Sequence, residues 1–203
     1  MNKLVAIALV VFFGKVSVLF AEHGHMDVVR EILLVCRSPE DPTPNDDLVD
    51  YARRTGLSDE DVSMMLIELV QDGLNGNLDV LQRQLTEGAL WSLSHFGAER
   101  ENEFVRTVML STQDSGLRQV CVRVGIRMMP EKWEEWVRAT ATDDRFDSLT
   151  RFDAYEEAYR VGMNGDENTR QQVEKVLSEF MERETTSGNS ISMQRWANEL
   201  KAR

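Results

Sequence analysis

Residues 58–71, SDEDVSMMLIELVQ, decide the fold class of this chain. Their apolar members recur at the spacing i, i+3, i+4, i+7 and i+8, which gathers them on one stripe of an α-helix; they are Val62, Met65, Leu66, Leu69 and Val70. Ser58 is followed three residues later by Asp61, a pattern that favours mutual capping at a helix start. The sequence therefore predicts an amphipathic helix here, ended by Gly73.

The same spacing returns at residues 173–181, and other predicted helical segments lie between residues 58–71 and this stretch. Helices are predicted over about 27–37, 78–96, 99–112, 117–129, 145–161 and 191–200, with a short one around Trp133 and Trp136. Gly97, Pro130 and Gly162 are the expected ends of three of them. Alternating strand patterns are almost absent, and the connections are short. The predicted fold class is all-α, with stacked antiparallel helix pairs.

The chain divides into four parts on this interpretation. Residues 1–21 are read as a signal peptide, and 22–45 as a first helix with a proline-rich loop. Residues 46–184 form a helical, repeat-like domain, and 185–203 form a polar linker and a last helix.

A weak internal repeat runs through the middle of the chain. Residues 89–97 (ALWSLSHFG), 120–128 (VCVRVGIRM) and 154–162 (AYEEAYRVG) share a small or branched first residue and apolar character at the second and fifth positions. Over about residues 78–184 the chain resembles the HEAT-like family of α-helical repeat proteins, although Arg127 and Met128 depart from its pattern. The resemblance implies an α-solenoid that binds other proteins. An irregular helical bundle is the alternative architecture.

The N-terminus predicts export. Met1-Asn2-Lys3 is followed by an unbroken apolar run over residues 4–13, and the chain becomes acidic beyond Ala21. This layout is typical of a secretory signal peptide cleaved after Ala21. Leu19 and Lys15 fit that pattern less well, so an uncleaved membrane anchor and a buried helix stay open. The expected location is periplasmic or secreted, with membrane attachment only if the segment is retained.

The charge balance narrows the classes of partner. The whole chain carries a formal net charge of −12, so phosphate backbones and anionic lipid surfaces would repel it. We therefore expect no nucleic-acid partner. The two cysteines, Cys36 and Cys121, would be permitted to form a disulfide after export. The apolar neighbours of Cys121 favour a buried free thiol instead.

Two acidic motifs suggest an alternative function. Residues 46–50 (DDLVD) and 143–147 (DDRFD) both have the pattern Asp-Asp-x-x-Asp, and i, i+4 carboxylates on a helix can hold Mg²⁺ together. Two such motifs on an all-α scaffold resemble isoprenyl diphosphate synthases, which implies a Mg²⁺-dependent enzyme. Both motifs also fall at predicted helix starts, where aspartates are favoured as caps, and capping is the preferred interpretation.

The candidate partner-binding residues are Arg118, Arg123 and Arg127, on one predicted helix. Arg123 and Arg127 are i, i+4 neighbours that can grip a carboxylate on another protein, or pair with acids of this chain. A tryptophan exposed beside them would complete a binding hot spot. His23 and His25 could loosely hold Cu²⁺ or Zn²⁺, but a solvated tail is the simpler interpretation, and no cofactor is expected.

These observations predict an exported, non-catalytic protein-interaction module. Its expected partner face is formed by residues 117–129 and 145–161. The Mg²⁺-dependent enzyme is the alternative, and it requires the two aspartate motifs to converge.

Overall fold

The computed structural model describes residues 24–35, 43–76, 78–185 and 187–202, and within these ranges it contains helices and no strands. The chain is therefore all-α, as predicted. The α-helices are α2 (His25–Val35), α3 (Thr43–Thr55), α4 (Asp59–Asn75), α5 (Val80–Phe96), α6 (Glu99–Ser111), α7 (Ser115–Met128), α8 (Trp133–Thr142), α9 (Ser148–Asn164), α10 (Glu167–Met181) and α11 (Asn189–Lys201). Two 3₁₀ turns, η2 (Pro130–Lys132) and η3 (Glu182–Glu184), precede α8 and follow α10.

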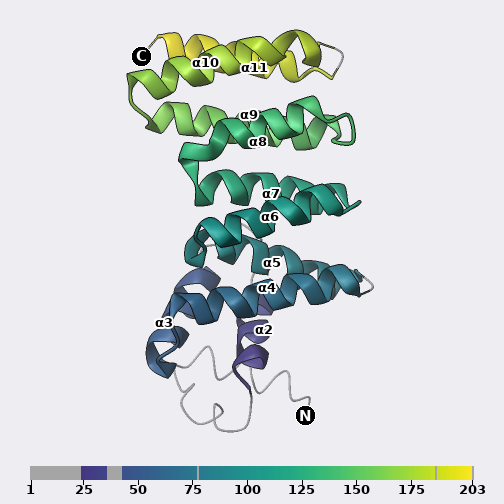
Figure 1. Cartoon of the computed structure of the whole chain (residues 1–203), viewed down its shortest axis with the longest axis vertical. Coiled ribbons are helices and arrows are strands. Elements are labelled where there is room, and N and C mark those ends of the chain that lie inside the picture. Colours follow the sequence, from purple (N-terminus) through teal and green to yellow (C-terminus); the bar gives the residue numbers. More distant parts are fainter. Residues whose placement is uncertain (1–23, 36–42, 77, 186, 203) are drawn as a thin grey trace.

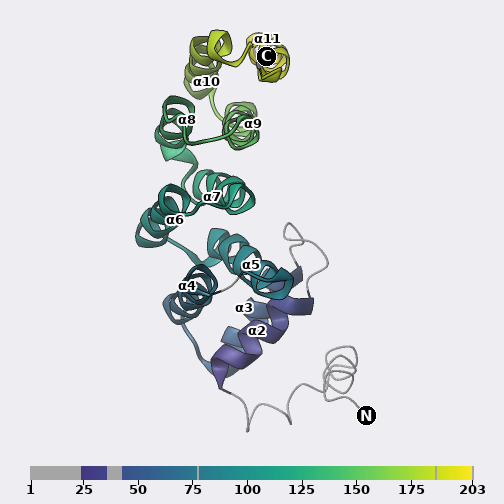
Figure 2. The same ribbon diagram turned by 90° about the vertical axis from the view of Figure 1, so that its right-hand side faces the viewer.

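Successive helices form antiparallel pairs that stack along the long axis of the molecule (Figure 1). Figure 2 shows two layers: α4, α6, α8 and α10 form an outer layer, and α5, α7, α9 and α11 form an inner layer on the concave side of a bend. Within the inner layer α7 packs on both α5 and α9, whereas α4, α6 and α8 mainly contact their inner partners. Closer packing in the inner layer explains the bend.

Both ends of the described chain belong to the stack. The first helix, α2, packs on α5, where Leu33 lies beside Gly88, and both Val29 and Leu33 are fully buried. At the other end α11 packs on α9 and α10 and buries Trp196 and Leu200. The core is thus one continuous seam between the two layers. None of the described helices has the length and the apolar character that crossing a bilayer requires.

The start of α4 is capped as predicted. Ser58 Oγ accepts a hydrogen bond from the Asp61 backbone N–H at 3.2 Å, and Asp61 Oδ2 accepts one from the Ser58 N–H at 2.9 Å. The end of the helix was predicted wrongly, because α4 continues through Gly73 to Asn75. A Cβ at Gly73 would lie 2.0 Å from Thr86 Oγ1 on α5, so this glycine permits close helix packing.

Gly162 was likewise predicted to end a helix and instead lies inside α9, which continues to Asn164. It is buried, and a Cβ there would lie 3.0 Å from Leu200 Cδ2 and 3.2 Å from Val173 Cβ. Gly97 does end α5, and its N–H donates to the Leu93 carbonyl. Glycines at close contacts and glycines at helix ends therefore look alike in the sequence.

The three segments of the weak repeat occupy successive inner helices. Residues 89–97, 120–128 and 154–162 lie at the C-terminal ends of α5, α7 and α9, which are neighbours in the inner layer (Figure 2). Of the three residues at the first position of the repeat, Ala89 and Ala154 are fully buried, whereas Val120 is partly buried.

Candidate interaction surface

The inner layer combines a basic helix with an acidic neighbour. Helix α7 carries Arg118, Arg123 and Arg127 and has no acidic residue. The adjacent α9 supplies Asp153 and Glu157, which are 3 % and 2 % exposed. The two helices lie side by side, so the arginines face carboxylates of the same chain.

Two ion pairs join these helices. Arg123 Nη2 donates to Asp153 Oδ1 at 2.6 Å, and Arg127 donates from Nη2 and Nε to the two oxygens of Glu157 at 2.7 and 3.1 Å. Burial raises the pKa of Asp153 above its ordinary value, although Arg123 acts in the opposite direction. A two-pronged arginine–carboxylate contact fixes geometry as well as charge, so it holds α7 and α9 in register.

Arg127 also contacts the helix on its other side. Its guanidinium carbon lies 4.8 Å from the centre of the Trp91 ring on α5, a cation–π arrangement. Arg160, one turn along α9, donates to Glu157 Oε1 at 2.8 Å. Glu157 is therefore held between two arginines, and one cluster spans three consecutive inner helices.

Arg118 has a different role from its two neighbours. It is 7 % exposed, and it donates to the backbone carbonyls of Thr112 at 2.9 Å and Arg145 at 2.7 Å. Its guanidinium carbon also lies 5.3 Å from the centre of the Phe146 ring. These contacts tie the α6–α7 turn to the α8–α9 connection. Of the three predicted partner-binding residues, Arg118 is thus buried, whereas the side chains of Arg123 and Arg127 are 26 % and 34 % exposed.

An apolar stripe continues the inner surface beyond these charges. Leu149, Phe152, Glu156 and Tyr159 follow helical spacing on one face of α9, and Leu149 is 63 % exposed. Phe152 and Tyr159 contact Trp196 of α11 at ring-centre distances of 5.4 and 5.3 Å. The four tryptophans are all buried, between 3 % and 7 % exposed, so none provides the exposed anchor considered from the sequence.

The two aspartate motifs do not form a common site. Asp46, Asp47 and Asp50 lie on α3, at the end of the stack opposite α11, and Asp50 pairs with Arg53 at 2.7 Å. The second motif lies in the connection between α8 and α9, in the upper half of Figure 1, away from α3 at the lower left. Burial and the neighbouring carboxylates of Asp50 and Asp46 raise the pKa of Asp47.

The second motif is engaged in local structure. Asp147 caps α9, accepting from the Thr150 N–H at 2.7 Å. The helix was predicted to begin at 145, with Asp143 and Asp144 at its start, and it begins three residues later, so the last aspartate of the motif is the cap. Asp143 instead follows the end of α8; hydrogen bonds from Arg145 lower its pKa to about 2. Asp144 pairs with Arg183 at 3.1 Å. The described residues contain no group of three or more histidines, cysteines and acids placed to hold a metal ion.

One of the two N-terminal histidines and one of the two cysteines lie within the described residues. His25 Nδ1 lies 2.5 Å from Tyr51 Oη, which joins α2 to α3, whereas His23 falls outside the described residues. Cys121 is a fully buried free thiol, and burial raises its pKa. Cys36 and the predicted signal segment also fall outside the described residues.

The acids Asp153 and Glu157 are the residues that sequence reasoning missed. A signal for them exists: Arg123 and Arg127 are four residues apart, Asp153 and Glu157 are four apart, and the two pairs are offset by 30 residues. The weak repeat has offsets of 31 and 34 residues, close to this value. The offset between the α7 and α9 segments is 34 residues, which would set Arg123 opposite Glu157, so the repeat indicates that the helices are neighbours but places the pairs one helical turn out of register.

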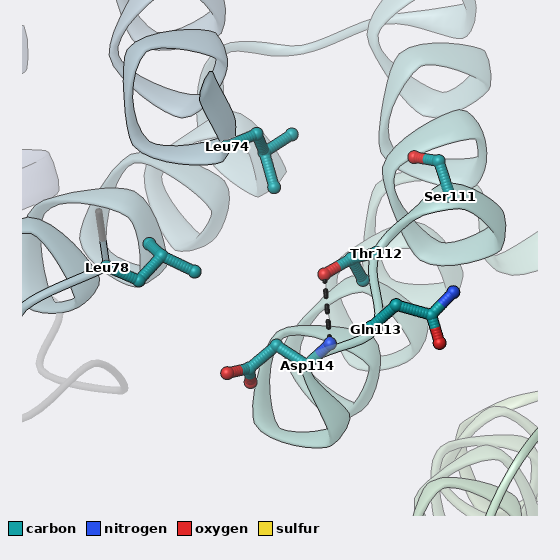
Figure 3. A pocket seen from close by; sticks show the side chains of 6 residues that line it. All are labelled: Leu74, Leu78, Ser111, Thr112, Gln113 and Asp114. Carbon is teal, nitrogen blue, oxygen red and sulfur yellow. Dashed lines mark hydrogen bonds between the residues drawn. The ribbon is translucent and has the colours of Figure 1, made fainter. Parts of the chain in front are cut away.

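Two open hollows lie at opposite edges of the stack. One, of about 570 Å³, lies between the α4–α5 turn and the α6–α7 turn (Figure 3). The other, of about 810 Å³, lies between the C-terminal parts of α7 and α9, and its lining includes Arg127, Trp133, Glu157 and Arg160. Comparison with protein-family models, with curated proteins and with solved structures gives no match to this chain.

Proposed function

We propose that this chain is a non-catalytic protein-interaction module that works outside the cytoplasm, built from helix pairs that resemble HEAT-like repeats. The observation that supports this most is the inner surface of α7 and α9. Internal ion pairs hold these helices in a fixed register, so little conformational freedom would be lost on binding.

The centre of the proposed partner face is Leu149. Its exposed aliphatic side chain lies on the same face of α9 as Phe152 and Tyr159, with the charged Glu156 and Arg160 around it. An apolar centre with a charged rim is the usual composition of a protein-binding patch. Arg123 and Arg127 extend the rim, because part of each side chain is exposed even though its charge is paired internally. Arg118 is excluded from the face because it is buried.

Cross-linking of the full chain in the native cell envelope tests this function. We expect one defined cross-linked complex, lost in Leu149→Asp and retained in the control Ile191→Asp. Ile191 is a comparable exposed aliphatic residue, 77 % exposed at the start of α11. A complex retained in both variants would refute the proposed face, and a chain that forms no complex would refute the function.

Export is tested separately by the mass of the protein recovered from the envelope. Cleavage after Ala21 yields a mature chain that begins at Glu22. A full-length product in the membrane fraction would support the anchor, and a full-length product in the cytosol would refute export.

A further inference from the structure

Two Asn-Gly sequences lie at the C-terminal ends of helices. Asn75 is the last residue of α4 and is followed by Gly76, and Asn164 is the last residue of α9 and is followed by Gly165. Each glycine has extended backbone angles and begins the turn to the next helix. Both asparagines are exposed, and their side chains form no hydrogen bond within the described residues.

An asparagine that is followed by glycine can lose its side-chain amide without an enzyme. The backbone nitrogen of the glycine gives up its proton and forms a bond to Cγ of the asparagine, and the amide nitrogen leaves as ammonia. Water then opens the resulting cyclic imide at either carbonyl, which yields aspartate or isoaspartate. Glycine favours the reaction because it has no Cβ to obstruct the approach and its backbone adopts many conformations.

The nitrogen that must react is held differently at the two sites. The Gly76 N–H donates to the Asp72 carbonyl at 3.0 Å, so this hydrogen bond must break before the nitrogen can attack. The Gly165 N–H forms no hydrogen bond of ordinary geometry within the described residues, although Gly165 follows α9 in the same way. Arg170 Nη1 donates to the Gly165 carbonyl at 3.1 Å, which holds the turn without engaging the Gly165 nitrogen.

Asn164 lies at the edge of the 810 Å³ hollow between α7 and α9. The lining of this hollow includes Arg127, Glu157 and Arg160, and both arginines donate to Glu157. A carboxylate in place of the Asn164 amide adds a negative charge to this group. Isoaspartate also lengthens the backbone of the turn, which ends at Asp166, the N-cap of α10.

We propose that Asn164 is a site of spontaneous deamidation in the folded chain, and that the cap hydrogen bond of Gly76 protects Asn75. The product is a turn between α9 and α10 that carries an added carboxylate, partly on a lengthened backbone. The chain therefore changes its charge at one edge of the inner layer as it ages. This inference concerns the chain alone and does not depend on the proposed partner face.

The test is incubation of the purified full chain in mildly alkaline buffer, followed by proteolysis at acidic pH and mass spectrometry of the peptides. Alkaline buffer promotes the reaction because the backbone nitrogen must lose its proton. We expect Asn164 to react about fivefold faster than Asn75, which is the rate equivalent of one backbone hydrogen bond. Chromatography should separate two products at this position, aspartate and isoaspartate.

The same incubation in concentrated urea is the matched control. Unfolding breaks the hydrogen bond between Gly76 and Asp72, so the two Asn-Gly sequences should then react at rates within about twofold of each other. Asn164→Gln is the second control, because the longer side chain forms the cyclic imide poorly. This variant should lose the modification at residue 164 and keep that at Asn75, with circular dichroism to confirm folding.

Three results would overturn the inference. Equal rates at Asn75 and Asn164 in the folded chain would show that the Gly76 hydrogen bond gives no protection. An intact Asn164 in the folded chain, with rapid reaction in urea, would show that the turn keeps its side chain away from the Gly165 nitrogen. Aspartate as the sole product would indicate direct hydrolysis by water instead of attack by Gly165.

Discussion

Gly125 provides the sharpest test of how the two layers pack. It lies inside α7, and a Cβ built there would be 2.1 Å from Trp136 Cζ2 and 2.4 Å from two further atoms of that ring. Trp136 is 3 % exposed on α8, so its ring has little free space around it. The Gly125 carbonyl also accepts a hydrogen bond from Asn102 Nδ2 at 2.7 Å, which restrains the backbone.

The expected cost of Gly125→Ala follows from this geometry. To reach an ordinary contact of 3.4 Å the ring must withdraw by about 1.3 Å. Overpacking of this kind costs about 1–3 kcal/mol and occasionally more, whereas replacing a helical glycine by alanine gains at most about 1 kcal/mol. Because the displaced group is a rigid buried indole, we expect a net loss of about 2 kcal/mol. For a chain of this size that lowers Tm by about 4–8 °C.

Gly88→Ala is the matched control. Gly88 is also a buried helical glycine, but the nearest atom to its Cβ would be Leu33 Cδ2 at 3.6 Å, an ordinary contact. This variant should be neutral or more stable by up to about 1 kcal/mol, since only the propensity gain remains. Urea unfolding followed by circular dichroism and tryptophan fluorescence measures both changes.

A second variant separates the clash from other effects. Trp136→Phe removes the colliding ring, so Gly125→Ala should cost at least 1 kcal/mol less in that background than in the native chain. A Gly125→Ala variant as stable as Gly88→Ala, or a double variant without coupling, would show that Trp136 does not restrict the space at Gly125.

Four further predictions concern ion pairs and hydrogen bonds of charged side chains. Glu184, 1 % exposed, accepts hydrogen bonds from Arg151, Tyr155, Ser187 and Asn189, and Glu184→Gln should cost about 2–4 kcal/mol in urea unfolding; no loss would contradict its bridging role. Burial raises the pKa of the Glu184 carboxyl, but the hydrogen bonds from these donors, Arg151 foremost, lower it below its ordinary value. The stability that Glu184 contributes is therefore present above the pKa of the unfolded state and is lost as the pH falls through the pKa of the folded state. Lowering the pH should therefore destabilise the native chain more than it destabilises the Glu184→Gln variant. Parallel plots of unfolding free energy against pH for the two proteins would contradict this. Arg118→Met should cost about 2–4 kcal/mol in urea unfolding. An Arg118→Lys variant with full native stability would contradict the role of the guanidinium in binding the carbonyls of Thr112 and Arg145 together. A double-mutant cycle of Arg127→Met and Glu157→Gln should show a coupling of about 1–3 kcal/mol, and zero coupling would mean that the pair does not hold α7 to α9.

Periodicity is a local property, and for that reason most of the fold could be predicted. The residues that the apolar spacing placed on one stripe of α4 include Val62, Leu66, Leu69 and Val70, all buried. The Ser58–Asp61 capping box involves residues three apart and was likewise visible. Gly73 was misread because its environment is set by Thr86 on another helix, which no pattern within α4 can reveal.

The candidate surface was predictable only in part. The arginines of α7 could be singled out because one helix carries three positive charges and no negative one. The carboxylates that pair with these arginines could not be predicted, since the sequence allowed pairing with another protein or with acids of this chain. The structure brings Asp153 and Glu157 within 2.7 Å of Arg123 and Arg127 and leaves Leu149 exposed beside them.

By itself the sequence determined the all-α class, the approximate positions of the helices, the acidic character of the chain and the cap at Ser58. Each of these depends on residues within one or two helical turns, or on composition alone. Only the tertiary structure decided which helices form the inner layer, which arginines are neutralised and which glycines lie at close contacts. These features depend on residues about 30 positions apart, and helix stacking alone makes them neighbours.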